Sequence, residues 1–401
     1  MNSKEKWITF LLLLSTFIGI SNVMIIAPLL KLFKLSIGIK ESQYGVVLGA
    51  YPILSFITSV IIGPISDKHG RRALLIIGLA GLSVCQLLTG FAYNFHTLVL
   101  FRALSGIFGA LIGTSVYAYV ADYFAPQKRI KVMGLVGGGM ALAQIAGIPI
   151  GILVGGAFSW NTVFFVFAAL SFILVINIIF FLPHPDIQLK KDKITLKTYQ
   201  KKYSVLSKDK NILLSLFTYF IMFSGVFIFA GAYPTWLYNQ FSPMGIGHID
   251  IAILFTVAGF GSWLGSSLSG RLSAKVKDKL QWVGILNLVI LIFIFSIPVF
   301  KNHFYFQFPL YFLMMVMGSL RFPVFQTIVL HLVGITERGS MSSSLNAMVQ
   351  MGSAVGAFLS GWLFHNDPSF FLNVGAIGGI FVFASLLLLF VLKENLHKDN
   401  R

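Results

Sequence analysis

Charged residues and cysteine are both scarce in this chain. Asp, Glu, Lys and Arg make up 11% of its 401 residues, whereas a soluble domain has about 25%. The single cysteine, Cys85, excludes an intramolecular disulfide framework and a cysteine-rich metal site. The motifs H-E-x-x-H and G-x-S-x-G, which mark zinc proteases and serine hydrolases, are also missing. The composition therefore argues against a soluble protein and against an enzyme, and it predicts neither a cofactor nor a metal.

Acidic residues are the rarest charged class. The chain has 13 Asp and Glu against 30 Lys and Arg, for a formal net charge of +17. None of these acids falls near the middle of an apolar segment. A binding site built within those segments would offer a permanently cationic ligand no opposite charge. The sequence therefore favours a neutral, zwitterionic or anionic ligand.

Long apolar runs are abundant. Hydrophobic residues make up 57% of the chain, and runs such as WITFLLLLSTFIGISNVMIIAPLL are apolar on every helical face. A helix needs about 20 such residues to cross the hydrocarbon core of a membrane, while the strands of a membrane barrel alternate apolar and polar residues. The sequence predicts an all-α membrane protein with twelve transmembrane helices, near residues 7–30, 43–65, 73–93, 96–122, 131–156, 159–182, 212–238, 249–271, 281–300, 304–332, 340–364 and 370–392.

The basic residues are distributed unevenly between the two sides of these spans. With the N-terminus in the cytoplasm, the inner segments hold 24 of the 30 Lys and Arg, the outer segments hold four, and two lie inside spans. This is the positive-inside pattern. It predicts a multi-pass protein of the cytoplasmic (inner) membrane with both termini in the cytoplasm. Nucleic-acid binding, the other interpretation of the net charge, is not needed to explain it.

A single long polar segment, residues 183–211, separates six spans from six. It is either a solvated basic linker or a short amphipathic helix on the anionic lipids of the inner leaflet. We expect two pseudo-symmetric six-helix bundles, residues 1–182 and 212–401. Offsets of 209 and 207 residues align identical residues of the two halves: Gly109/Gly318, Arg129/Arg338, Gly147/Gly356, Gly63/Gly270, Ser66/Ser273 and Lys68/Lys275. Six plus six spans with such a repeat are typical of a transporter.

The stretch GPISDKHGRR, residues 63–72, follows the second span. It matches G-x-x-x-D-[R/K]-x-G-R-[R/K] at every defined position, and so it resembles the signature of the major facilitator superfamily. Span count, loop placement and repeat extend the resemblance to the whole chain. It implies a gating latch at the cytoplasmic helix ends, made by Gly63, Asp67, Gly70, Arg71 and Asp122. The alternative is a basic turn that only anchors topology. The corresponding positions of the second half lack both acids, so we expect the latch in the N-terminal half.

The fifth span contains the sequence GIPIG, with Gly147, Pro149 and Gly151. It resembles the helix-5 motif of family exporters, in the compact form of sugar- and purine-efflux-like permeases. It departs from the fuller motif, in which glycine directly precedes proline. Small residues allow close helix packing, and proline removes one backbone hydrogen bond. The resemblance implies efflux, with uptake as the alternative.

Two arginines fall inside spans, where burial costs about 2.5–3.5 kcal/mol. Arg102 stands where the family's helix-4 motif lies, and the resemblance implies a role in substrate binding or proton coupling; snorkelling to the outer headgroups is the alternative. Arg321 lies near the middle of the tenth span, where snorkelling is difficult. Further substrate or proton candidates, on spans expected to line a cavity, are Asn22, Gln144, Tyr233, Gln326, His331, Asn346 and Gln350.

These features together predict a secondary active transporter that moves a small organic molecule by alternating access. We expect proton-coupled efflux by a monomer. Uptake of an organic anion or metabolite and multidrug export of lipophilic compounds are the alternatives. Because the spans lack an acid at mid-depth, the proton carrier is expected to be Asp122, His331 or the substrate itself. A receptor that does not transport is an alternative of another class, and an intact latch argues against it.

Overall fold

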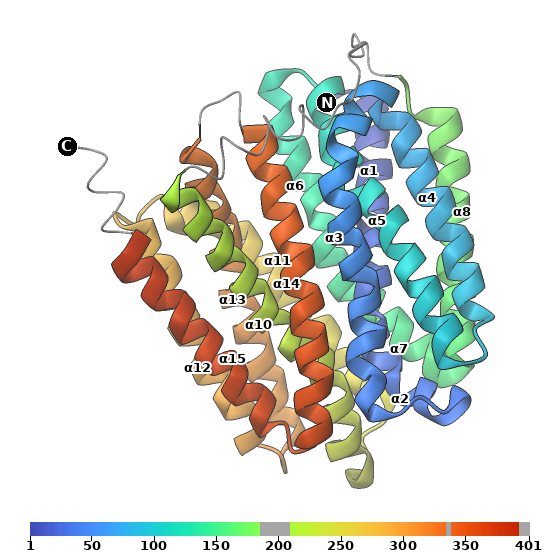
Figure 1. Ribbon diagram of the computed structural model, residues 1–401, viewed down its shortest axis with the longest axis vertical. Coiled ribbons are helices and arrows are strands. Elements are labelled where there is room, and N and C mark those ends of the chain that lie inside the picture. Colours follow the sequence, from blue (N-terminus) through green and yellow to red (C-terminus); the bar gives the residue numbers. More distant parts are fainter. Residues whose placement is uncertain (185–208, 334–337, 393–401) are drawn as a thin grey trace. The chain divides into compact units, whose positions relative to one another are not determined.

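The computed structural model describes residues 1–184, 209–333 and 338–392, with the backbone alone at 63–69, 126, 130, 338–340 and 389. Within these ranges the chain forms helices and no strand (Figure 1). Twelve of the described helical segments are long and apolar enough to cross a membrane. The predicted all-α membrane fold is therefore confirmed. The predicted linker, 183–211, lies almost wholly outside the described residues.

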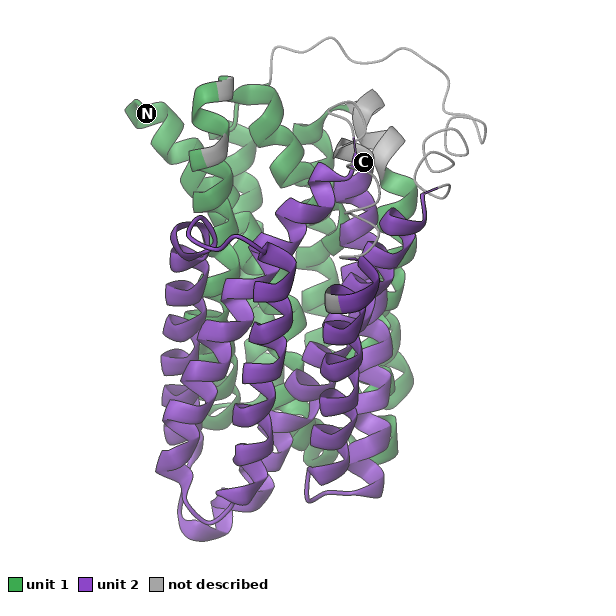
Figure 2. Ribbon diagram, turned by 90° about the vertical axis from the view of Figure 1, so that its left-hand side faces the viewer, with its two compact units in different colours: residues 1–194 green, residues 195–401 purple. Residues whose placement is uncertain are grey.

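Contacts divide the chain into two compact units, unit 1 (1–194) and unit 2 (195–401), which are coloured separately in Figure 2. The helices of unit 1 are α1 (Ser3–Met24), α2 (Ile26–Ile37), η1 (Glu41–Gln43), α3 (Tyr44–His69), α4 (Arg71–Gly90), α5 (Phe95–Tyr123), α6 (Pro126–Leu142), the π turn η2 (Ala143–Gly147), α7 (Ile148–Ala157) and α8 (Trp160–Phe181).

The helices of unit 2 follow the same sequence of long spans and short connections. They are α10 (Lys210–Phe241), η3 (Ser242–Met244), α11 (His248–Ser273), α12 (Lys279–Val299), η4 (Phe304–Phe306), α13 (Gln307–His331), α14 (Arg338–Asn366), α15 (Phe371–Leu386) and the π turn η5 (Leu387–Leu392).

The two units use one packing pattern. In unit 1, α5 packs against α3 and α4, α4 packs against α8, and α1 packs against α6 and α8. In unit 2, α13 packs against α11 and α12, α12 packs against α15, and α10 packs against α14 and α15. Helix α5 thus corresponds to α13, and α1 corresponds to α10. The repeat that is weak in sequence is clear in the way each unit is packed.

Small residues allow the equivalent helices to approach closely. A Cβ on Gly147 would lie 2.2 Å from Oγ of Ser21 on α1, and a Cβ on Gly356 would lie 2.3 Å from the backbone oxygen of Ser224 on α10. Only glycine fits at such a crossing without moving its neighbour. The alignment of Gly147 with Gly356 therefore corresponds to a shared helix contact in each unit.

The second span is longer than predicted. The sequence analysis placed residues 63–72 in a loop, but α3 continues to His69 and α4 begins at Arg71. Gly70 alone separates them, with a φ of +84°, a conformation that glycine adopts at little cost. The turn is therefore a single residue, because glycine's positive φ lets one helix end and the next begin without further connection.

Candidate functional site

The predicted latch lies where α4 begins and α5 ends. Nε of Arg71 donates to Oδ2 of Asp122 at 3.1 Å, and both side chains are mostly buried. Because Gly70 ends α3 so sharply, Arg71 occupies the first turn of α4 and reaches the last turn of α5. The side chains of Gly63 and Asp67, the other predicted latch residues, are outside the described part of the chain.

A second arginine of the motif fastens two helices. Arg72 donates from Nε to the backbone oxygen of Leu182 and from Nη2 to that of Ile179, both at 2.6 Å. These carbonyls end α8, which packs beside α4 (Figure 1). A cation at a helix C-terminus satisfies orphan carbonyls and the helix dipole. The sequence analysis missed this cap, because nothing in a basic run tells which of its members will bind a carbonyl.

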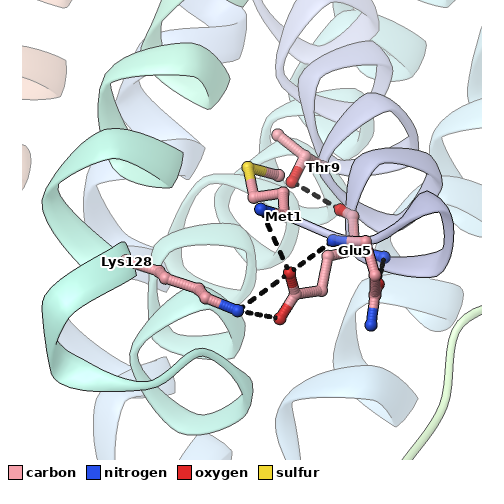
Figure 3. A network of polar contacts seen from close by, with 5 residues as sticks. Met1, Glu5, Thr9 and Lys128 are labelled. Atoms are coloured by element: carbon pink, nitrogen blue, oxygen red, sulfur yellow. Dashed lines mark hydrogen bonds and ion pairs between the residues drawn. The ribbon is translucent and has the colours of Figure 1, made fainter.

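An ion pair joins the first turns of α1 and α6, as Figure 3 shows. Nζ of Lys128 lies 2.8 and 3.1 Å from the two carboxylate oxygens of Glu5, and the amine of Met1 lies 3.9 Å from one of them. Lys128 follows Asp122 by six residues. The Glu5 pair and the Arg71 pair therefore lie at the same end of unit 1.

The arginine of α5 lies inside unit 1 in a polar cluster without an acid. Arg102 is fully buried, and Nη1 donates to Oδ1 of Asn22 on α1. Its guanidinium carbon lies 5.2 Å from the centre of the Tyr51 ring on α3, a distance suited to cation–π attraction. We call Arg102, Asn22 and Tyr51 the Arg102 cluster. The alternative that Arg102 snorkels to the headgroups is wrong, because none of its side chain is exposed.

Glycines on α5 position the ring of this cluster. A Cβ on Gly106 would lie 2.2 Å from the backbone oxygen of Tyr51, and a Cβ on Gly109 would lie 1.7 Å from its hydroxyl. These two positions therefore need to be glycine for α3 to lie against α5 with the Tyr51 ring between them. Tyr51 was not predicted, and the glycines were its sequence signal.

Several donors of the Arg102 cluster have no partner. Among the described residues, nothing accepts a hydrogen bond from Nε or Nη2 of Arg102, or from Nδ2 of Asn22. Neither Arg102 nor Asn22 takes part in an ion pair there. A buried donor left unpaired costs about 1–3 kcal/mol, and more when it is charged. The cluster is therefore complementary to a group that brings negative charge or acceptor oxygens.

The helix-5 motif lines the crossing with α1. Gly147 faces Ser21, and a Cβ on Gly151 would lie 3.2 Å from Ile25. Pro149 lies in the first turn of α7, directly after the π turn η2. Gln144 belongs to that π turn and is buried, and its Oε1 has no hydrogen-bond partner among the described residues. π turns are frequent at functional sites. The motif thus brings η2 against the part of α1 that carries Ser21, and α7 against Ile25, the residue between α1 and α2.

Arg321 is buried too, but in unit 2 and toward other helices. Its Nη1 donates to Oδ1 of Asn287 on α12, and its guanidinium carbon lies 4.7 and 4.4 Å from the ring centres of Phe322 and Phe381. Asn287 was not predicted. Its signal was present, because it is the one asparagine in the apolar run from Val283 to Phe295.

The other predicted candidates do not gather around either arginine. Tyr233 is buried and donates to Oε1 of Gln307 at 3.3 Å, within a group of aromatic rings. Gln326 and His331 are exposed, and Asn346 and Gln350 are half-buried. Asn22 and Arg102 are a predicted pair outside the latch that a direct hydrogen bond joins.

The chain is similar over most of its length to several known proteins. The family profile described as Major Facilitator Superfamily matches residues 12–299 and 215–401. The chain is 30% identical to the uncharacterized MFS-type transporter YceJ of Bacillus subtilis (strain 168), over 94% of this chain and 92% of the relative. It is 29% identical to the class B tetracycline resistance protein of Escherichia coli over 70% of this chain and 69% of that protein.

A further relative and a solved structure extend the likeness along the chain. The multidrug resistance protein MdtG of Proteus mirabilis (strain HI4320) is 24% identical over 91% of both chains. A bacterial homolog of the human lysosomal transporter Spinster, in an inward-facing and unoccupied conformation, has a TM-score of 0.78 at 14% identity and covers 100% of this chain and 99% of its own. At 14% identity, the similarity to this solved structure shows the fold alone.

Proposed function

The chain belongs to the Major Facilitator Superfamily, and from this premise we propose that this integral membrane transporter exports a small neutral, zwitterionic or anionic organic molecule. It acts as a monomer in the inner membrane, with both termini in the cytoplasm. The cargo crosses by alternating access, and protons moving inward drive it. Its relatives and fold are those of transporters and not of enzymes.

The observation that carries this proposal is the acid-free Arg102 cluster. Arg102 is fully buried, takes part in no ion pair among the described residues, and has Nε and Nη2 without partners. A guanidinium edge of this kind binds a carboxylate through two parallel hydrogen bonds. A cationic cargo would instead be repelled. The cluster therefore selects cargo that carries acceptor oxygens or negative charge.

Asn22 adds to the same preference. Its Oδ1 already accepts from Arg102, which leaves Nδ2 as the end of the amide that can still bond. Nδ2 is a donor, as are Nε and Nη2 of Arg102. These two hydrogen-bonded side chains thus have three donors without partners, which can bind an oxyanion or a group with several carbonyl oxygens. Gln144 differs, because its unpartnered atom is the acceptor Oε1, and it would bind a hydroxyl or amine of the same cargo.

The proposed gate is the ion pair at the ends of α4 and α5. Arg71 and Asp122 hold these ends together in one conformation of the transport cycle, and the pair opens in the other. Protonation of Asp122 would remove its negative charge and weaken the pair. Asp122 is therefore our first candidate for the proton carrier, with the cargo and His331 as the others.

Export of lipophilic drugs is the second candidate function. It is favoured by the relatives named for multidrug and tetracycline resistance, and by the aromatic group around Tyr233 in unit 2. That group includes Phe229, Trp236, Tyr311 and Phe370. Aromatic faces bind flat apolar molecules with few polar contacts. In that case recognition would not depend on Arg102.

Transport by everted membrane vesicles tests the proposal. Vesicles with an acidified interior should accumulate a radiolabelled organic acid or zwitterion, and a protonophore should abolish the accumulation. Arg102→Gln should abolish it as well, whereas Arg102→Lys, which keeps the charge but loses the fork, should retain part of it. Arg321→Gln, in the other unit, serves as the matched control. Accumulation confined to lipophilic cations, and unchanged by Arg102→Gln, would contradict the proposal.

A further inference from the structure

Unit 2 contains a second buried cation that lacks an acid. Arg321 is 1% exposed, and it takes part in no ion pair among the described residues. Nη1 of Arg321 donates a hydrogen bond to Oδ1 of Asn287. Nε of Arg321 and Nδ2 of Asn287 have no hydrogen-bond partner among the described residues. Asn287 is fully buried. Two bonded side chains from α12 and α13 thus present unmatched donors inside unit 2.

Aromatic rings lie over the guanidinium of Arg321, but its Nε–H donor has no hydrogen-bond acceptor among the described residues. The rings of Phe322 and Phe381, at 4.7 and 4.4 Å, supply cation–π attraction. Hydrogen bonds, by contrast, need acceptors in the guanidinium plane. Backbone oxygens nearby already accept other donors: that of Leu320 from Ser269, and that of Gly284 from Ser385. The missing partner of the guanidinium edge is therefore an acceptor that the described residues do not supply.

We propose that Arg321 and Asn287 bind a compact monovalent anion within unit 2, either chloride from solution or a small carboxylate. One positive charge is neutralised by one negative charge, and the two donors are satisfied together. The setting is apolar, because aromatic rings and a cluster of Leu286, Val316 and Leu320 lie on these same helices. A divalent anion would leave one charge unpaired in that apolar setting, which strongly disfavours it.

The bound anion would fasten three helices. Asn287 lies on α12, Arg321 on α13 and Phe381 on α15, and α12 packs against both of the others. A ligand that binds the folded protein alone raises the free energy of unfolding by RT ln(1 + [L]/Kd). Binding at Arg321 should therefore appear as a stabilisation that grows with the logarithm of the anion concentration above Kd. This proposal does not rest on the proposed cargo, since the Arg102 cluster belongs to unit 1.

Thermal unfolding of the purified protein in detergent tests the site. Sodium gluconate, whose anion is bulky, is exchanged stepwise for sodium chloride or for sodium acetate at constant ionic strength. We expect the melting temperature to rise with the logarithm of the anion concentration in at least one series. Arg321→Gln should abolish the rise. Asn287→Ala, which keeps the cation, should weaken the apparent affinity by about tenfold, as expected for one hydrogen bond to a charged group. The Arg102 cluster also has unpartnered donors that a carboxylate can fill, so both series are repeated in the Arg102→Gln background, where a rise that depends on Arg321 should remain.

Each outcome bears on the proposal. A rise in chloride alone assigns the site to a halide from solution, and a rise in acetate assigns it to a carboxylate. If Arg321→Gln does not fold, loss of affinity in Asn287→Ala still supports the site. A melting temperature that is the same in all three salts overturns the proposal. So does a rise that Arg321→Gln and Asn287→Ala both retain, or one that Arg102→Gln alone removes.

Discussion

The two units place one arginine each on equivalent helices, but they turn it toward different neighbours. Arg102 on α5 reaches Asn22 on α1 and Tyr51 on α3. Arg321 on α13 reaches Asn287 on α12 and Phe381 on α15. Helices α5 and α13 occupy equivalent places in their units, but the arginines stand at different positions along them: with the offset of 209 residues Arg102 aligns with Tyr311, and Arg321 aligns with Ile112. The repeat thus preserves the packing of the helices, while the buried arginine contacts different helices in each unit.

The glycines at close helix contacts also differ between the two units. In unit 1 the glycine is on α5, where Gly106 meets the backbone oxygen of Tyr51 on α3. In unit 2 it is on α11, where a Cβ on Gly265 would lie 2.2 Å from the backbone oxygen of Val316 on α13. The close contact between these equivalent helices is present in both units, but the glycine comes from α5 in unit 1 and from α11, the counterpart of α3, in unit 2. Gly318, aligned with Gly109 in sequence, has nothing within 4 Å of its Cβ position.

The largest effect is expected from Gly106→Ala compared with Gly318→Ala. The first places a methyl group 2.2 Å from a backbone oxygen, and such overpacking costs about 1–3 kcal/mol. The second meets open space, and alanine's helix propensity makes it neutral or stabilising by up to about 1 kcal/mol. Thermal unfolding of both variants measures the difference. Equal melting temperatures would show that the two glycines are equivalent after all.

Next in size is the effect of the two arginines on cargo affinity. Arg102→Gln removes charge-assisted hydrogen bonds worth about 1.5–3 kcal/mol, so cargo affinity should fall about 10–100-fold. Arg321→Gln should leave that affinity within about twofold, because Arg321 faces α12 and α15 in the other unit. Titration of an anionic or zwitterionic cargo against both purified variants checks this. An equal loss of cargo affinity in both variants would contradict the proposal that Arg102, and not Arg321, binds the cargo.

The two arginines of the latch motif should separate transport from stability. Arg72→Gln removes two hydrogen bonds to the carbonyls that end α8, and we expect a loss of about 1–2 kcal/mol in unfolding free energy. Arg71→Gln leaves the mostly buried carboxylate of Asp122 without this partner, which also destabilises the fold, and in addition it should abolish vesicle transport. Measured on both variants, the melting temperature should fall in each, whereas transport should be lost in Arg71→Gln alone.

The smallest effect is a pH dependence in the connection between α14 and α15. Burial raises the pKa of Asp367, but hydrogen bonds from Ser369 and from the backbone N–H of Leu372 outweigh it and hold the pKa below its usual value. Its stabilising contribution is therefore complete above about pH 4, the pKa of an unfolded Asp, and is lost as the pH falls further. Asp367→Asn should flatten the dependence of melting temperature on pH in this range. An unchanged slope would contradict it.

Sequence reasoning was strongest where the membrane imposes the answer. Apolar length and the uneven placement of lysine and arginine predicted twelve helices, and the described residues contain twelve segments of that kind. The positions of the acids also indicated that a site within the spans would lack an acidic residue. The motif at residues 63–72 pointed to Arg71 and Asp122, which do pair. These predictions rest on the length of apolar segments, on the placement of charged residues and on one sequence motif. They do not require knowledge of how the helices pack.

What depends on helix rotation could not be predicted. Apolar residues surround every face of α12 and α13, so the sequence did not show that Arg321 faces Asn287. The same applies to Tyr51 beneath Arg102 and to the cap that Arg72 makes on α8. The predicted loop at residues 63–72 failed for a different reason: a single glycine at φ +84° is enough to turn the chain. Gln326 and His331 were predicted on spans expected to line a cavity, and both are exposed, so their role stays a prediction.

One measurement tests the central claim most directly. A thermal-shift screen would compare matched anionic, zwitterionic, neutral and cationic compounds on the purified protein and on Arg102→Gln. A ligand at a hundred times its Kd raises the free energy of unfolding by about 2.7 kcal/mol. We predict stabilisation by anionic or zwitterionic compounds that disappears in Arg102→Gln. Stabilisation by lipophilic cations alone, retained in Arg102→Gln, would contradict the account.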